Sequence, residues 1–395
     1  MTTSMPSWTV ADLFSCGGGT SAGFGRKEKF QLVAALDSEI AKPSGGPGTS
    51  DCNATYEANH GIRPLAEDIA TFSPASFKDA FGIQDLSVLI SCAPCTDFSR
   101  AKPENHIRDS KKNDLVGRGV DYVEALRPEI FFLENARELI SGNLKHHHTR
   151  LCERLKQLGY EVRSEVLRLD RYGLPQIRER AVVIASRIGQ PRTLSDLWGD
   201  WEVDRNAITV RSALERLEEA KEASETHPSG DFHPRTGHEV SLRIAATPKD
   251  GGSWIDLARH PHTRELLPPV CLRRWESGKI GSHPDVYGRM AWDRPSPTIK
   301  RECGHVGNGR YTHPEKNRLL TVREMATLQG FPFDYVFAAR SIANRYRHIG
   351  DAVPPLIAWQ FACLAEWMKI GRRPEPEQWV MPKTSLCSAD LRRQR

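Results

Sequence analysis

The feature that most constrains the fold is an alternation, in the first half of the chain, of short apolar runs with stretches of helical pattern. The apolar runs are rich in Val, Ile, Leu and Phe and have the length of strands. The predicted strands are 9–14, 32–37, 88–91, 130–134, 162–169 and 181–186. The predicted helices between them include 22–26, 53–59, 115–126 and 148–158. This alternation predicts an α/β fold of the doubly wound type, in which a parallel sheet carries helices on both faces.

The alternation stops near residue 187, and from there to about residue 292 Gly, Pro, His and Trp become frequent. We expect a small, irregular region here, with one charged helix at 210–223. Regular signals then return, and they predict a strand near 298–301, a helix that opens at Thr321 with a capping box to Glu324, and an apolar helix over 354–370. A tail rich in Pro and Arg is expected to be loose. The predicted division is 1–186, 187–292, 293–345, 346–372 and 373–395.

Composition limits the class of protein. Lys and Arg number 55 against 50 Asp and Glu, so the net charge of +5 permits nucleic-acid binding without requiring it. The nine cysteines are scattered and odd in number, which favours free thiols in a reducing compartment. The N-terminus lacks the pattern of a secretion signal, and no apolar run approaches the ~20 residues of a membrane span. We therefore expect a cytoplasmic, soluble protein without a membrane partner.

A glycine-rich loop follows the first predicted strand, within 11–24, and opens a helix. Its spacing is not G-x-G-x-x-G, which argues against a dinucleotide pyrophosphate. Asp37 ends the second strand, where a carboxylate can accept hydrogen bonds from ribose hydroxyls, and Asp68 with Ile69 would suit an adenine ring. From the spacing alone, a nucleotide-like ligand and a purely structural turn both remain open.

A cysteine and a carboxylate follow two neighbouring predicted strands. The run 88–99 ends a buried strand in Pro94-Cys95, and Glu134 closes the next apolar strand. Both would lie at the carboxyl edge of the sheet, where open α/β sheets bind ligands. Arg178 and Arg180 open a further strand and would share a face by period-two alternation. One alternative is thiol–disulfide exchange by Cys92 and Cys95; a zinc site lacks a second C-x-x-C, so no metal is predicted.

Taken in order, these motifs resemble those of the cytosine-5 DNA methyltransferases. The resemblance rests on Pro94-Cys95 with Phe98-Ser99, on Glu134-Asn135 and on the Gln-x-Arg-x-Arg run that begins at Gln176. The segments 294–299 and 308–332 resemble the family's ninth motif, and Gly-Asp-Ala-Val-Pro at 350–354 resembles its tenth. The resemblance implies an S-adenosylmethionine-dependent methyltransferase fold with an inserted target-recognition domain. It also implies methyl transfer to C5 of a cytosine flipped out of double-stranded DNA.

The resemblance assigns roles residue by residue. It makes Cys95 the nucleophile, has Glu134 bind and protonate N3 of the cytosine, and has Arg178 contact O2 while Arg180 orients its neighbours. The residues implied for S-adenosylmethionine are Phe14, Cys16, Gly17, Gly19, Asp37, Ser38, Asp68, Ile69, Pro94, Leu115, Asp351, Ala352 and Val353. Two of them depart from the family pattern: Cys16 stands where glycine is usual, and Asp351 stands where asparagine is usual. We expect the carboxylate of Asp351 to weaken cofactor binding modestly.

The DNA would be held by the basic loop 99–112, which follows the cysteine, and by the irregular region. The residues implied for DNA contact are Ser99, Arg100, Lys102, Arg108, Gln176, Arg273 and Arg274. The resemblance places the chain, as a monomer, beside a cognate restriction endonuclease or other defence-system proteins. The alternatives are an RNA cytosine-5 methyltransferase of the same fold and a catalytically silent DNA-binding relative.

Overall fold

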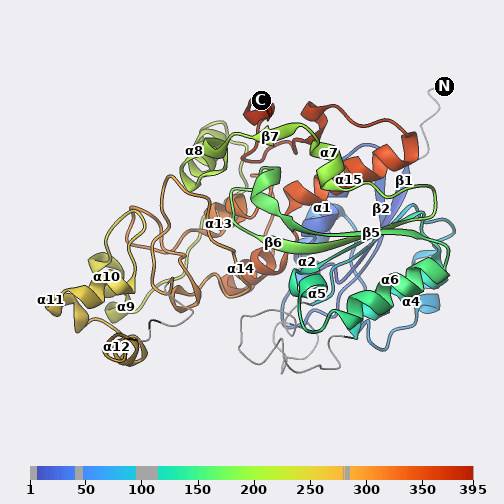
Figure 1. Cartoon of the computed structure of the whole chain (residues 1–395). Helices are drawn as coiled ribbons and strands as arrows, with labels where there is room; N and C mark the ends of the chain where they lie inside the picture. Colours follow the sequence, from blue (N-terminus) through green and yellow to red (C-terminus); the bar gives the residue numbers. More distant parts are fainter. Residues whose placement is uncertain (1–6, 41–47, 95–113, 279, 281–284, 395) are drawn as a thin grey trace.

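A six-stranded sheet lies at the centre of the protein (Figure 1). The computed structural model describes residues 7–40, 48–94, 114–278, 280 and 285–394. The strands are β1 (Trp8–Leu13), β2 (Phe30–Leu36), β3 (Val88–Ser91), β4 (Ile130–Ala136), β5 (Glu161–Arg168) and β6 (Glu179–Ser186), in the spatial order β2-β1-β3-β4-β6-β5. All six predicted strands are confirmed. The sheet is mixed rather than purely parallel, because β6 runs antiparallel to both β4 and β5.

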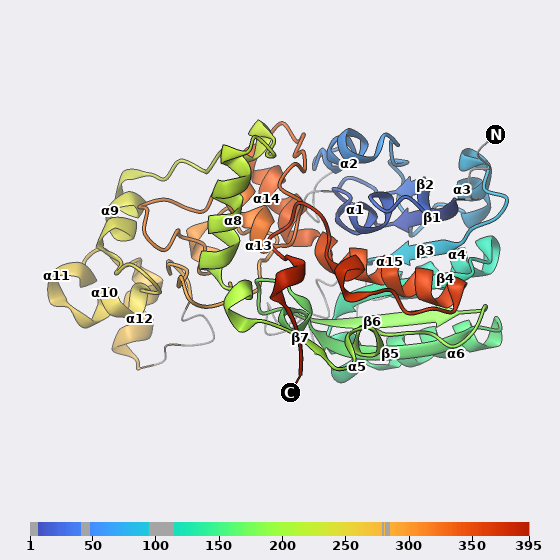
Figure 2. The ribbon, with the colours of Figure 1, turned by 90° about the horizontal axis from the view of Figure 1, so that it is seen from above.

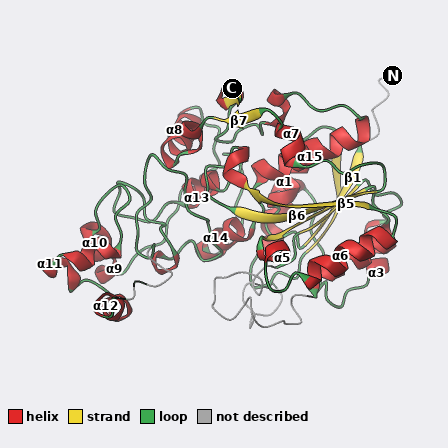
Figure 3. Ribbon diagram, in the orientation of Figure 1, coloured by secondary structure: helices red, strands yellow, loops and turns green. Residues whose placement is uncertain are grey.

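Helices cover both faces of the sheet, which confirms the predicted α/β fold class (Figure 3). The helices of one face are α1 (Gly19–Gly25) and α15 (Pro355–Ile370), and those of the other are α3 (Pro74–Phe81), α4 (Leu115–Leu126) and α6 (His146–Gln157). Side chains of β3 alternate between two separate cores: Val88 and Ile90 pack toward α15, whereas Leu89 packs toward α4. The period-two pattern of strands therefore divides the apolar residues between the two layers.

The order of the strands creates a crevice. From β1 the chain passes to β2 on one side and later returns to β3 on the other side of β1. Ligands of open α/β sheets bind at such a switch point, beyond the carboxyl ends of the strands. The loops that follow β1 and β3 are those expected to carry the cofactor site and Cys95.

The last long helix, α15, packs beside the helix that follows the first strand. α15 is buried along Pro355–Glu366 and packs against α1 (Figure 2). A Cβ atom on Gly23 of α1 would lie 2.3 Å from the backbone nitrogen of Trp359, so only glycine permits this approach. Helix α14 (Ile342–Asp351) leads into α15. The two ends of the sequence thus form one layer.

Two predictions for the second half were wrong. Residues 298–301 form no strand, because Pro295 and Pro297 lack the N–H groups that a ladder needs, and only an isolated bridge joins Ser296 to Gln176. The tail is not loose. Trp379, Met381 and Leu386 are buried, and β8 (Leu391–Arg393) pairs with β7 (Trp201–Val203).

The region 187–292 is more regular than expected. It contains the helices α7 (Leu194–Trp198), α8 (Val210–Glu222), α9 (His238–Ala246), α10 (Trp254–Arg259), α11 (Pro261–Arg264) and α12 (Pro269–Glu276). α7 and α8 share the large core with α15 and with α13 (Val322–Leu328), which opens with the predicted capping box. The helices α9–α12 lie apart from the sheet in both views (Figures 1 and 2). They hold a small core of their own: Trp254, Leu257, Ala258, Leu267 and Cys271. We call α9–α12 the helical lobe.

A buried arginine fastens the helical lobe to the rest of the chain. The Arg289 side chain is fully buried, and its guanidinium donates to the carbonyls of Ile244 and Thr247 on the lobe side. It also donates to the carbonyls of His313 and Lys316 and to the side chain of Asn317. One side chain therefore ties the end of α9 to the segment that precedes α13.

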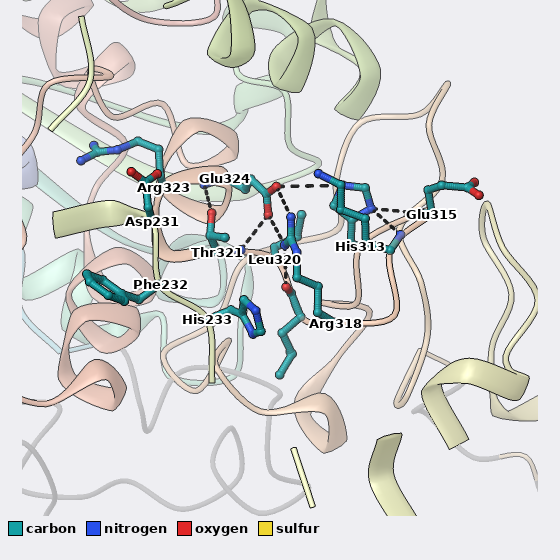
Figure 4. A network of polar contacts seen from close by, with 12 residues as sticks. Asp231, Phe232, His233, His313, Glu315, Arg318, Leu320, Thr321, Arg323 and Glu324 are labelled. Carbon is teal, nitrogen blue, oxygen red and sulfur yellow. Dashed lines mark hydrogen bonds and ion pairs between the residues drawn. The ribbon is translucent and has the colours of Figure 1, made fainter. Parts of the chain in front are cut away.

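Beside this joint, Glu324 lies at the centre of a polar network (Figure 4). Its carboxylate accepts two hydrogen bonds of 2.7 Å from Arg318 and one of 2.7 Å from the backbone N–H of Thr321. Burial would raise the pKa of Glu324, but Arg318 holds it below its usual value. Burial lowers the pKa of His313 to about 4, so the neutral ring accepts at Nδ1 from the N–H groups of residues 315 and 316. The network fixes the start of α13.

In the residues that the structure describes, no helix combines the length and the apolar character needed to cross a bilayer.

Candidate active site

The glycine loop after β1 adopts an unusual backbone. Phe14 and Cys16 have φ angles of 59° and 47°, in the left-handed region that bulky and branched residues rarely adopt, and Gly18 has a φ of 83°. The loop is held from behind: the Tyr335 hydroxyl donates to the Gly17 carbonyl at 2.5 Å, and His60 Nε2 lies 3.1 Å from the Gly18 carbonyl. Strain of this kind, kept in place by surrounding contacts, is typical of binding sites.

The glycines of this loop are required by contacts within the protein. A Cβ atom on Gly18 would lie 2.4 Å from His60, and one on Gly19 would lie 2.8 Å from both Ala352 and the Val353 carbonyl. The structure therefore brings Ala352 and Val353 directly against the predicted cofactor loop.

Carboxylates converge on the same place. Asp37 accepts hydrogen bonds from the backbone N–H groups of Cys16, at 2.9 Å, and Glu39, at 2.8 Å. Asp12 is 1% exposed; its Oδ2 accepts from Ser21 at 2.7 Å, whereas its Oδ1 finds no donor among the described residues. Burial, with a smaller contribution from the charge of Asp37, raises the pKa of Asp12 to about 7.

The chemistry of this acidic cradle suits S-adenosylmethionine. A buried carboxylate oxygen without a donor, next to a second carboxylate, suits a ligand that brings cationic groups and hydroxyls. Asp351 completes the acidic set from the other side, but its Oδ2 lies 3.2 Å from Arg301 Nη1. The Asp351 carboxylate, which the resemblance places in the cofactor site, is therefore already paired with a cation.

The remaining predicted cofactor residues lie in loops that follow β2 and β3 and at the start of α4. Asp68 is exposed and accepts from the backbone N–H of Ala70 at 2.9 Å, while Ile69 is buried. Leu115 opens α4 and is half-buried, as is Ser38 after β2, and Pro94 is exposed after β3.

Glu134 and Arg180 form an ion pair at the edge of the sheet. The antiparallel register of β4 and β6 sets Ala136 opposite Arg180, two residues from Glu134. The Arg180 Nε atom lies 2.8 Å from Glu134 Oε1, and the two side chains are 15% and 13% exposed. A carboxylate and a guanidinium are thus presented together at the mouth of the crevice.

Arg178 does not share this position, although period-two alternation predicted that it would. β6 begins only at Glu179, so Arg178 lies in the preceding loop. It is 3% exposed and donates to the carbonyls of Ile299 and Ala352, at 3.0 and 3.3 Å. Gln176, predicted to contact DNA, is fully buried and donates to Gln329 at 2.7 Å. Arg178 thus ties the 299 and 352 segments to the sheet, and Gln176 ties residues 299 and 329 to it. Their contacts with the base and with DNA stay predictions.

The loop that carries Cys95 leaves the sheet beside this pair. Asn135 is fully buried and donates to the Ala93 carbonyl at 3.0 Å, so the end of β4 holds the chain two residues before Cys95. Cys95 itself lies outside the described residues. So do Ser99, Arg100, Lys102 and Arg108.

The Cys92 thiol, part of the alternative exchange site, lies 3.6 Å from the Thr20 hydroxyl. Removal from water and the charges of Asp12 and Glu134 raise its pKa well above the usual range. Since exchange needs a thiolate, this environment disfavours thiol–disulfide exchange at Cys92. In the described ranges no group of three or more His, Cys, Asp or Glu side chains is arranged to hold a metal ion.

The arginines of the helical lobe fall into two groups, one with partners within the protein and one without a partner among the described residues. Arg259 pairs with Asp256, Arg264 donates to the Ala258 carbonyl, and Arg243 donates to the Leu266 carbonyl. Arg273 and Arg274 of α12 have no hydrogen bond or ion pair of their side chains within the part of the chain that the structure describes. Their charges are available to a partner.

Comparison with known proteins agrees with this geometry. The model of the C-5 cytosine-specific DNA methylase family matches residues 8–362, so the chain belongs to this family and is a DNA cytosine-5 methyltransferase by class. The Type II methylase M.HgiDII of Herpetosiphon aurantiacus is 32% identical over 87% of this chain and 91% of its own length. The Type II methyltransferase M1.HphI of Haemophilus parahaemolyticus is 31% identical over 90% of this chain and 86% of its own.

Among solved structures, the fold is similar to that of the S. pombe Dnmt2 methyltransferase, with a TM-score of 0.55 and 16% identity over 91% of this chain and 98% of that chain. It is equally similar to the Entamoeba histolytica methyltransferase EhMeth, with a TM-score of 0.55 and 12% identity over 93% and 99% of the two chains. These likenesses support the fold.

Sequence reasoning missed several residues of the site. Asn135 was noted only as part of a motif, and Tyr335 and His60 were not singled out. Their partners are backbone carbonyls from distant segments, which no local pattern reveals. The apolar run of this strand starts only at Ala181. Because side-chain alternation applies only within a strand, this start could have shown that Arg180 and Arg178 need not share a face.

Proposed function

We propose that the protein transfers a methyl group from S-adenosylmethionine to C5 of a cytosine flipped out of double-stranded DNA, through a covalent bond between Cys95 and C6. The observation that carries this proposal is the Glu134–Arg180 pair, which lies beside the loop leading to Cys95 and opposite an acidic cradle. A carboxyl group and a cation at one point suit a ring that gains negative charge during the reaction.

For the cofactor, we assign Asp12 and Asp351 to the amino-acid end, Asp37 to the ribose and Asp68 with Ile69 and Leu115 to the adenine. Phe14, Cys16, Gly17, Gly19, Ser38, Pro94, Ala352 and Val353 would complete the walls. The bound cofactor supplies an electrophilic methyl group. Asp12 would then gain the cationic donor that its buried Oδ1 atom lacks in the protein alone.

For the substrate, the Cys95 thiolate adds to C6 of the ring, because C5 of cytosine alone is a poor nucleophile. Glu134 binds N3 and gives it a proton, which neutralises the ring as the sulfur–carbon bond forms. We assign the contact with O2 to Arg180, since Arg178 is engaged by two backbone carbonyls. Arg178 keeps the 299 and 352 segments in place around the site.

For the DNA, we propose that the helical lobe reads the sequence and that loop 99–112 closes on the flipped nucleotide. A base within a duplex cannot reach an enclosed thiol, so flipping is required. Arg273 and Arg274 would reach base edges or phosphates from α12, whereas Gln176 is too deeply buried to take part. The sequence predicted a target-recognition region that begins at residue 187. We propose that it begins at about residue 238 instead, where the helical lobe starts.

The relatives named as Type II methylases suggest the context. We propose that the protein protects host DNA beside a cognate restriction endonuclease or within another defence system, and that it acts as a monomer. Bisulfite sequencing of DNA from cells that express the protein would report the activity and the methylated sequence together.

The covalent step is tested with a DNA duplex that carries 5-fluorocytosine in the methylated sequence, which should trap the wild-type protein in the presence of S-adenosylmethionine. Cys95→Ser should give no adduct and no methyl transfer while keeping DNA affinity, since a hydroxyl is far less ionised than a thiol. Cys92→Ser is the matched control and should still be trapped. Turnover by Cys95→Ser, or an adduct at Cys92, would reject the mechanism.

A further inference from the structure

Two side chains from distant segments hold the carbonyl groups of the glycine loop. The Tyr335 hydroxyl oxygen lies 2.5 Å from the Gly17 carbonyl oxygen, and His60 Nε2 lies 3.1 Å from the Gly18 carbonyl oxygen. The two side chains also meet each other, since His60 Nε2 lies 3.3 Å from the Tyr335 hydroxyl. The contact between Tyr335 and Gly17 joins residues that stand 318 positions apart in the sequence.

The hydrogens of this group can be assigned from the donors at hand. Burial raises the pKa of the Tyr335 hydroxyl well above its usual range and lowers the pKa of His60 to about 4, so both groups are neutral. The single hydroxyl hydrogen of Tyr335 goes to Gly17, because a carbonyl oxygen only accepts. His60 must then carry its hydrogen on Nε2 in order to donate to the Gly18 carbonyl. Each carbonyl thus accepts one hydrogen bond from a side chain.

Tyr335 and His60 are joined to each other by their neighbours in the chain. His60 is the last residue of α2 (Cys52–His60). The preceding residue, Asn59, exchanges two hydrogen bonds of 2.8 and 2.9 Å with the backbone of Val336, which follows Tyr335. The Tyr335 side chain is also fully buried. The two donors therefore form one fixed unit beside the loop.

The loop needs such support because its backbone is strained. Phe14 and Cys16 have φ angles of 59° and 47°, and conformations of this kind persist only where the surroundings fix them. Asp37 fixes one point of the loop, since it accepts from the backbone N–H of Cys16 at 2.9 Å. The hydroxyl and imidazole groups fix the two carbonyls that follow. The fit is close, because a Cβ atom on Gly18 would lie 2.4 Å from the imidazole of His60.

We propose that Tyr335 and His60 are positioning residues, which hold the glycine loop in the conformation that receives the amino-acid end of S-adenosylmethionine. This inference rests on the proposed function. The carbonyl oxygens of Gly17 and Gly18 are bonded within the protein, so the loop does not turn these negative dipole ends toward the carboxylate of the cofactor. Without the two donors, the strained loop relaxes and must be ordered again when the cofactor binds. Binding is then weaker, although the reacting groups are unchanged.

The test compares two variants that each remove one buried hydroxyl group and keep the ring. Tyr335→Phe takes the donor away from Gly17. Tyr346→Phe is the matched control, because Tyr346 is 1% exposed and donates to the Leu320 carbonyl, at 2.6 Å, outside the glycine loop. We expect Tyr335→Phe to bind S-adenosylmethionine about tenfold more weakly by calorimetry, as when one hydrogen bond is lost, and Tyr346→Phe to bind it like the wild type.

Further readouts separate positioning from general stability. The affinity for 5′-methylthioadenosine, which lacks the amino-acid end, should be the same in Tyr335→Phe and the wild type. In methyl transfer, the KM for S-adenosylmethionine should rise while kcat and the KM for DNA stay within about twofold of the wild type. His60→Ala should also weaken cofactor binding. His60→Gln should restore most of the affinity, because its amide N–H can replace the Nε2 donor.

Hydrogen exchange of the loop amides, measured without cofactor, does not depend on the proposed function. Exchange of residues 14–19 should be faster in Tyr335→Phe than in Tyr346→Phe. Equal cofactor affinity in these two variants, an equal loss of affinity for 5′-methylthioadenosine and S-adenosylmethionine, or no recovery in His60→Gln would each overturn the inference. Wild-type protein that binds no S-adenosylmethionine would instead overturn the proposed function, and the exchange rates would still decide whether the two side chains hold the loop.

Discussion

The crevice of the sheet and the helical lobe use arginine in opposite ways. In the crevice, Arg178 is buried and donates to backbone carbonyls of two other segments and to the side chain of Gln176. In the lobe, the side chains of Arg273 and Arg274 have no partner among the described residues. Fixed contacts keep reacting groups in place, whereas unpaired charges can adapt to a partner. On the proposed function, the first kind of arginine belongs to the part of the chain that performs chemistry and the second to the part that selects the substrate.

The two regions also differ in the size of their cores. The sheet is enclosed by two extended apolar clusters, and the helical lobe holds a cluster of five buried residues that includes Trp254. A small core gives little stability of its own, so the lobe depends on the joint at Arg289. The lobe can therefore change without disturbing the sheet.

The largest effect is expected in the crevice. Glu134→Gln should lower methyl transfer by about 10²–10⁴-fold, because an amide can hydrogen-bond the ring but cannot give it a proton. Cofactor affinity, measured by calorimetry, should be unchanged. Glu179→Gln is the control, since Glu179 pairs with Arg137 at 2.6 Å outside the crevice. Normal single-turnover rates in Glu134→Gln would mean that another group protonates the ring.

The next effect separates the two regions. Trp254→Ala should cost the helical lobe about 3–5 kcal/mol, since it empties the centre of a small core. DNA binding should be lost while S-adenosylmethionine binding persists. Trp379→Ala, which removes an equally buried ring from the large core, should lower the melting temperature of the whole protein. Equal loss of cofactor binding in both variants would show that the regions are not independent.

Removing single charges from α12 should weaken DNA binding less than disrupting the core of the helical lobe. Arg273→Ala and Arg274→Ala should each cost about 1–3 kcal/mol of DNA binding if they reach base edges, and should relax the methylated sequence at one position. Arg259→Ala is the control, because Arg259 is already paired with Asp256. Sequencing of a methylated random library would show the change. An unaltered sequence preference with weaker binding would assign both arginines to phosphates.

The smallest effect is expected at Asp351. Asp351→Asn loses an ion pair with Arg301 that is partly exposed and worth about 0–1 kcal/mol, and it gains an amide donor. We expect cofactor affinity to stay within about threefold of the wild type by calorimetry. A tenfold loss would show that the carboxylate contributes directly to binding.

The sequence predicted the strands well, because β-branched runs bounded by turn residues favour strands whatever the surroundings. It could not predict the direction of β6, which depends on the path of the chain around β5. The buried tail was missed because its apolar residues, the short run 379–381 and the single Leu386, are separated by polar residues and show no helical or strand period. The family motifs predicted where the site lies, but the different surroundings of Arg178 and Arg180 depend on the start of β6 at Glu179.

The packing of α15 on α1 has a consequence for synthesis. The glycine loop leaves the ribosome first, yet the residues that hold it, Tyr335, Ala352 and Val353, are made last. At about 5–20 residues per second, roughly 20–70 s separate the two events. Throughout that interval the loop has its contacts with His60 and Asp37 but lacks these later ones, so the predicted cofactor site of a nascent chain is incomplete. We therefore expect activity to appear only late in translation, and a chain cut short before Tyr335 to lack it.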